Sequence, residues 1–115
     1  LTLIDHKRAT ALGAADLPTL PAAFAERYGQ TKRAAGEQSG LDPAEVLTGL
    51  FLAVRRTLVG TVLASPPEKL AEPLPTPHPL FATQGEAALF MGLHAAMHLG
   101  QITVIRRQLG YPPVS

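Results

Sequence analysis

A run of 19 residues without a charged side chain, 87–105, constrains the fold of this chain most strongly. Thr83 and Glu86 precede the run with the spacing of a capping box, in which each residue satisfies a free backbone N–H of the first helical turn. Gly110 and two following prolines provide a stop signal. We therefore expect one long helix from Thr83 to about Leu109.

This run is close to the roughly 18 to 20 apolar residues that cross a bilayer. It also contains two histidines, a glutamine and a threonine, whose polar groups need partners in hydrocarbon. We find no second segment of this kind in the sequence to provide them. The run is therefore interpreted as a helix of a soluble protein.

Similar signals predict the other helices. Apolar side chains on one face and a terminal Gly13 indicate a helix from Leu1 to about Leu12, with Leu1, Ile4, Ala11 and Leu12 facing the core. Asp42 as N-cap, Pro43 at the first helical position and Glu45 two residues later indicate a helix from Pro43 to about Ala64.

Gly and Pro residues interrupt the two connections. Between 14 and 40 we expect a long functional connection, with a short helix over 21–28 that packs Phe24 and Tyr28. Six prolines fall between 65 and 82, where we expect one turn near 68–71. No segment shows a strand signal. We therefore predict an all-α fold, and apolar faces as broad as these usually require a fourth helix.

Length and composition restrict the function classes. A chain of 115 residues and 12.1 kDa is one domain, 1–115, and its net charge of +1 provides no basic surface for nucleic acid. It contains no cysteine, so metal chemistry must use histidines and carboxylates.

The chain opens on Leu1 within a helical pattern and without a signal-peptide layout. We expect a preceding segment and a cytoplasmic protein.

His94 and His98 are the strongest candidate site. Four residues apart, they lie on one helix face and can converge on one metal ion. That face also carries apolar residues, so we expect both rings to point inward, where a metal would partner them. In the alternative interpretation, one ring is a core histidine and the other is half exposed. Gln101 lies one turn further, where it either hydrogen-bonds to a metal-binding histidine or a metal-bound water, or is an ordinary polar residue near the helix end.

A metal site needs a third protein ligand, and the sequence offers two weak candidates. His6 lies opposite the predicted core face of its helix, so we expect it to point to solvent. His78 lies between two prolines in a loop and is expected to be exposed.

The segment from His94 through Leu99-Gly100-Gln101 to Gly110-Tyr111-Pro112-Pro113 resembles the last helix of the DinB-like (YfiT-like) putative metalloenzymes. The resemblance extends back through 81–90 and more loosely over the chain. It implies a four-helix bundle of up-down-down-up type and a divalent metal, zinc or nickel, held by three histidines. His94 and His98 match two of them.

The family's first histidine precedes an acidic residue by five positions, and Leu1 to Asp5 resembles the family's residues after that histidine. The resemblance therefore implies that the chain lacks the family's first helix and first ligand. Characterised relatives include thiol-dependent isomerases and transferases. The resemblance thus implies a metal-dependent S-transferase or isomerase that uses a low-molecular-weight thiol on a small electrophile.

Two alternatives remain open. The first is a non-catalytic module or stress-response protein with a structural metal or none. Each long helix carries apolar residues on a second face: Leu52, Val59 and Leu63 on the helix from Pro43, and Leu89, Leu93 and Val104 off the histidine face of the last helix. Helices that are apolar on two faces predict a homodimer or a missing helix. The second is metal-assisted hydrolysis, for which no general base is evident.

Overall fold

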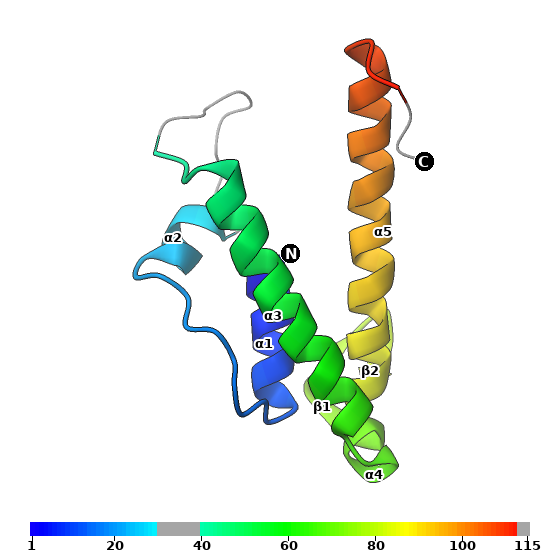
Figure 1. Cartoon of the computed structure of the whole chain (residues 1–115). Helices are drawn as coiled ribbons and strands as arrows, with labels where there is room; N and C mark the ends of the chain where they lie inside the picture. The colour runs from blue at the N-terminus through cyan, green and yellow to red at the C-terminus, as the bar shows by residue number, and fades with distance from the viewer. Residues whose placement is uncertain (30–39, 113–115) are drawn as a thin grey trace.

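The computed structural model describes residues 1–29 and 40–112, and part of the predicted 14–40 connection lies outside them. In the described residues the chain forms five helices and a two-stranded antiparallel hairpin (Figure 1). The elements are α1 (Thr2–Ala11), α2 (Phe24–Tyr28), α3 (Ala44–Ala64), α4 (Pro67–Ala71), β1 (Pro73–His78), β2 (Phe81–Thr83) and α5 (Gln84–Gln108). The fold is therefore mostly helical, as predicted.

The start and end of α5 confirm the sequence signals. Thr83 Oγ1 accepts a hydrogen bond from the backbone N–H of Glu86 at 3.2 Å, and Glu86 Oε2 accepts one from the N–H of Thr83, also at 3.2 Å. At the other end, Gly110 has φ = +81°, a left-handed conformation that glycine adopts without a steric penalty. Both ends of the helix that carries the histidine pair are thus fixed locally.

The predicted cap of α3 is wrong. Pro43 is the N-cap residue, and no side chain caps the helix. The carboxylate of Asp42 instead accepts hydrogen bonds from the hydroxyl of Tyr28 at 2.6 Å and from Arg27 at 3.1 Å. Since these two donors belong to α2, Asp42 joins α2 to the start of α3, a tertiary contact that local spacing cannot reveal.

The prediction that no strand forms is also wrong. Residues 73–78 and 81–83 pair as β1 and β2, in a register that joins Pro73 to Thr83 and His78 to Phe81. The prolines of β1 lack a backbone donor, but a strand in a two-stranded sheet has one unpaired edge where a donor is not needed. Proline also fixes φ near a value compatible with extended backbone.

The core lies where α1, α3 and α5 meet. Ala9, Leu12, Leu58 and Met91 form it. The buried face of α1 differs from the predicted one, because Asp5, Ala9 and Leu12 are buried while Leu1, Ile4 and Ala11 are exposed. The helix is therefore rotated relative to the sequence prediction, and a carboxylate enters the core.

The two long helices bury fewer apolar side chains than the sequence predicted. Figure 1 shows α3 and α5 close together near the hairpin and diverging toward the other end of α5. By helical spacing, the histidine face of α5, which we predicted to point inward, also carries Ile102, Ile105 and Leu109, and all three are exposed. The accessible surface is 8133 Å², against about 6,000 Å² for a compact monomer of this mass. Exposed apolar side chains on α3 and α5, among them Leu63 and Leu89, contribute to this surface.

Both α3 and α5 are long and apolar enough to cross a membrane by length and composition alone. The sequence pattern indicated only one such segment, and this finding corrects that prediction. The test is weak evidence for a membrane, because core helices of soluble proteins also pass it.

Candidate metal centre

His94 and His98 lie side by side on α5. Their Nε2 atoms are 3.0 Å apart and their ring centroids 4.7 Å apart. The four-residue spacing accounts for this, because residues i and i+4 lie one above the other on a helix. Both side chains are half buried rather than enclosed. The structure therefore brings the two predicted ligands together, facing one another through the same ring nitrogen.

Gln101 orients the second ring. Its Oε1 lies 2.8 Å from Nδ1 of His98. Because an amide oxygen only accepts hydrogen bonds, this contact assigns the Nδ1 proton to His98 and leaves its Nε2 with a free lone pair. A histidine that binds a metal through Nε2 has this tautomer, commonly fixed by such a partner.

The environment of His94 favours its neutral form. Burial lowers the pKa of His94, and the neighbouring His98 lowers it further. A neutral imidazole is the form that binds a metal ion. Nδ1 of His94 is buried and has no hydrogen-bond partner in the described residues. This nitrogen therefore lacks the partner that Gln101 provides for His98.

The spacing of the two nitrogens fits a metal ion. At usual zinc–nitrogen distances of about 2.0 to 2.1 Å, two nitrogens 3.0 Å apart would subtend roughly a right angle at one ion. The same distance fits a hydrogen bond from one ring to the other. The pair is therefore arranged either to share a proton or to share a cation.

The two other histidines lie away from the pair. His6 does not point to solvent as predicted: it is half buried, and its Nε2 lies 3.2 Å from the carbonyl oxygen of Pro18. The reason is that the 14–20 segment folds back over this side of α1. His78 is exposed, as predicted, and its ring stacks on Phe81 with centroids 3.9 Å apart. Within residues 1–29 and 40–112 no three potential ligands form a metal-binding group.

The start of α1 lies near the histidine pair. The positive charge of the Leu1 amino group acts on the pKa of His94, lowering it. Leu1 and His98 also line one groove.

Sequence reasoning missed a buried ion pair in the same region. The side chain of Asp5 is 0% exposed, and its Oδ2 lies 2.6 Å from Nε of Arg55 on α3. A signal was available, since Asp5, Ala9 and Leu12 follow helical spacing. Asp5 on this face of α1 and Arg55 among the apolar residues of α3 would together have predicted a buried ion pair.

Comparison with protein-family models, with curated proteins and with solved structures found no match for this chain. The resemblance to the DinB-like family thus stays a prediction that depends on the residues of the last helix.

A groove of about 500 Å³ lies beside His98 between α1, α3 and α5. Its walls are mostly apolar and consist of Leu1, Leu47, Phe51, Ile102 and Ile105. The polar residues that line it are Thr2, Thr48, His98 and Gln101. The groove therefore places an apolar surface next to the imidazole pair.

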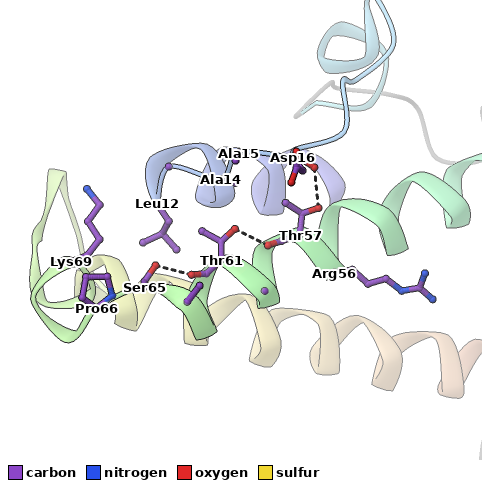
Figure 2. A pocket seen from close by; sticks show the side chains of 13 residues that line it. Leu12, Ala14, Ala15, Asp16, Arg56, Thr57, Thr61, Ser65, Pro66 and Lys69 are labelled. Atoms are coloured by element: carbon purple, nitrogen blue, oxygen red, sulfur yellow. Dashed lines mark hydrogen bonds between the residues drawn. The ribbon is translucent and has the colours of Figure 1, made fainter.

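Another cavity, of about 730 Å³, lies between the end of α1 and the second half of α3. Figure 2 shows Thr57, Thr61 and Ser65 along its floor, where their hydroxyls donate to backbone carbonyls. Arg56 and Lys69 lie at opposite ends in the same view and do not converge. The three hydroxyl groups of this cavity are thus engaged by backbone carbonyls of the protein.

Proposed function

We propose that this chain is part of a divalent-metal-dependent enzyme of the DinB-like type, with His94 and His98 as metal ligands and zinc or nickel as the ion. The observation that carries the proposal is the 3.0 Å separation of the two Nε2 atoms. The Gln101 contact supports it, because it leaves the Nε2 lone pair of His98 free.

The proposed fold is a four-helix bundle. The helices α1, α3 and α5 supply three members, and the family resemblance places another before Leu1. The exposed apolar side chains on α3 and α5 support a further layer over the diverging helices. The proposed third ligand belongs to that preceding segment. This position is supported by Leu1, which lines the same groove as His98 and whose amino group acts on the pKa of His94.

The proposed reaction is thiol transfer or isomerisation on a small electrophile. When bound, a divalent ion would lower the pKa of a coordinated thiol, which a chain without cysteine would take from a low-molecular-weight cofactor. The protein's own residues then position the reactants. Gln101 holds the ring of His98, while Phe51 and Ile102 provide apolar contacts for a substrate in the groove.

A direct test adds the proposed third ligand. Zinc affinity is measured for this chain and for a version with one histidine added before Leu1. We expect the added histidine to tighten binding at least tenfold, and a control with an added alanine to leave it unchanged. Equal affinities in the two extended chains would contradict the proposed position of the third ligand.

A second candidate function is a non-catalytic homodimeric module. Two leucines favour it, since Leu63 on α3 and Leu89 on α5 are 82% and 80% exposed. Both line an apolar groove of about 280 Å³ between these helices. A second copy could therefore cover this groove, in agreement with the predicted homodimer.

A further inference from the structure

The side of α5 that points away from the core carries large apolar side chains that the described residues leave uncovered. Leu89, Leu93 and Val104 are 80%, 59% and 56% exposed. They share one face of the helix, because the steps between them are close to whole numbers of helical turns. Ala87 and Met91, on the opposite side of α5, are buried. Figure 1 shows α1 and α3 on the same side of α5, so this outer face is open to a partner.

Opposite charges lie at the two ends of the outer face. Residues 87–105 are uncharged, and Glu86 and Arg107 beyond them are exposed. Glu86 precedes Leu93 by about two helical turns and Arg107 follows Leu93 by about four, so both belong to this face. Two parallel α5 helices would bring like charges together at each end, and like charges repel. Two antiparallel helices instead bring Glu86 of each beside Arg107 of the other.

The register that pairs these charges also matches side chains by size. With Glu86 beside Arg107 of a second copy, the two-fold axis passes between residues 96 and 97, and Leu93 lies opposite Gly100. Beyond the chain neighbours of Gly100 and the backbone of its own helix, nothing in the described chain lies within 4 Å of the position that a Cβ would take there. A large side chain opposite a small one lets two helices interdigitate closely. Charge and shape therefore favour the same antiparallel register.

We propose that the outer face of α5 binds a second copy of this chain, with the two α5 helices antiparallel. This interface goes beyond the proposed metal-dependent function and gives the homodimer a defined geometry. Leu89 of each copy packs against Val104 of the other. By helical spacing, His94 and His98 lie on another face of α5, so the interface leaves both rings uncovered.

A lipid surface is the other partner that an uncharged helix face takes. α5 is also long and apolar enough to cross a membrane by length and composition alone. A bilayer, however, gives Glu86 and Arg107 no fixed partners, whereas a second copy pairs both of them. The opposite charges therefore favour the second copy.

Disulfide cross-linking tests the register, because the chain contains no cysteine and one introduced thiol reports a single position. Ala96→Cys places a thiol beside the two-fold axis. Leu89→Cys is the matched control, since its two copies lie 15 residues apart along the antiparallel helices, roughly 22 Å. A disulfide needs Cα atoms less than about 7 Å apart. We expect most of Ala96→Cys and almost none of Leu89→Cys to become covalent dimer, and a mixture of Leu89→Cys with Val104→Cys to cross-link.

Charge reversal tests the two ends of the interface. We expect Arg107→Glu to weaken dimerisation about tenfold in sedimentation velocity, because like charges then meet at both ends. Adding Glu86→Lys to this variant should recover most of the affinity. Arg56→Glu, the same change of charge at an exposed position on α3, should leave dimerisation unchanged. Circular dichroism checks that α5 is intact, because Glu86 belongs to its capping box. If the double variant does not fold, Arg107→Glu and the cross-links still decide.

Three results would overturn the interface. The first is equal cross-linking of Ala96→Cys and Leu89→Cys, which indicates parallel or random contact. The second is monomeric wild type at tens of micromolar. The third is a monomer that binds phosphatidylcholine vesicles through this face, which would assign it to lipid. All variants keep both histidines and are measured without metal, so these results are independent of zinc binding.

Discussion

Nε of Arg55 lies 2.6 Å from Oδ2 of Asp5, and this contact joins α3 to α1 at the centre of the molecule. The same guanidinium donates to the carbonyl of Met91 on α5. Three helices that share only a small apolar core are therefore also connected by one charged side chain. The positions of α1 and α5, and hence of the histidine pair, depend on it.

Replacing Arg55 by methionine should destabilise the protein by about 3 kcal/mol, because removal of one partner leaves the other buried charge uncompensated. Urea unfolding monitored by circular dichroism measures the change. The double variant Asp5→Leu with Arg55→Met should recover most of the loss, since it removes both charges. A double variant that is as unstable as the two single changes added together would argue against a coupled pair.

Thr83→Ala should lower the free energy of unfolding by about 1 kcal/mol, the usual effect of removing an N-cap side chain. The reason is that Thr83 Oγ1 accepts a hydrogen bond from the N–H of Glu86 at the start of α5. Glu45→Ala is the matched control, because no side chain caps α3. Equal effects of the two changes would contradict the assignment of the caps.

The metal-free protein should lose stability as the pH falls below about 6.5, the ordinary pKa of histidine. The pKa of His94 is lowered in the folded state by burial, by His98 and by the positive charges of Leu1 and Arg55, while Asp5 opposes them. A group with a lowered folded pKa takes up its proton more readily when unfolded. Its contribution is therefore present above pH 6.5 and is lost as the pH falls through the folded pKa.

Unfolding in urea at pH 8 and pH 5.5 measures this effect. The loss between the two pH values should be smaller in His94→Gln than in the wild type. His78→Gln is the control, because His78 is exposed. A loss of the same size in all three proteins would assign the pH dependence to other groups.

If a second copy covers the groove between α3 and α5, Leu89→Glu should convert a dimer to a monomer. A charge placed at an apolar interface is desolvated without a partner. Light scattering should give twice the chain mass of 12.1 kDa for the wild type and the single mass for the variant. Monomeric wild type at tens of micromolar would contradict the homodimer.

Local signals predicted most of the helices in this chain. The ends of α5 follow from Thr83, Glu86 and Gly110, because capping groups lie within a few residues of each other. The pairing of His94 with His98 follows from helical spacing for the same reason. The structure adds that Gln101 contacts His98, which helical spacing alone left open.

Tertiary contacts account for the features that the sequence did not reveal. Asp42 has the spacing of an N-cap, but Tyr28 and Arg27 bind it instead. From the sequence, Asp5 was noted only as part of the family pattern. In the structure it is buried in the core and paired with Arg55. The rotation of α1 and the exposure of Ile105 depend on how helices pack, which no local spacing determines.

Metal content measures the central claim most directly. The chain with one histidine added before Leu1, which completes the proposed three-ligand site, is saturated with zinc, dialysed against metal-free buffer and analysed by mass spectrometry for metal per chain. His94→Ala, His98→Ala and the control His78→Ala are made in the same extended chain. The account predicts one zinc per chain in the extended chain and the control, and loss of the metal in the two site variants. Retention of zinc by the double variant His94→Ala with His98→Ala, or its absence from the extended chain, would contradict the account.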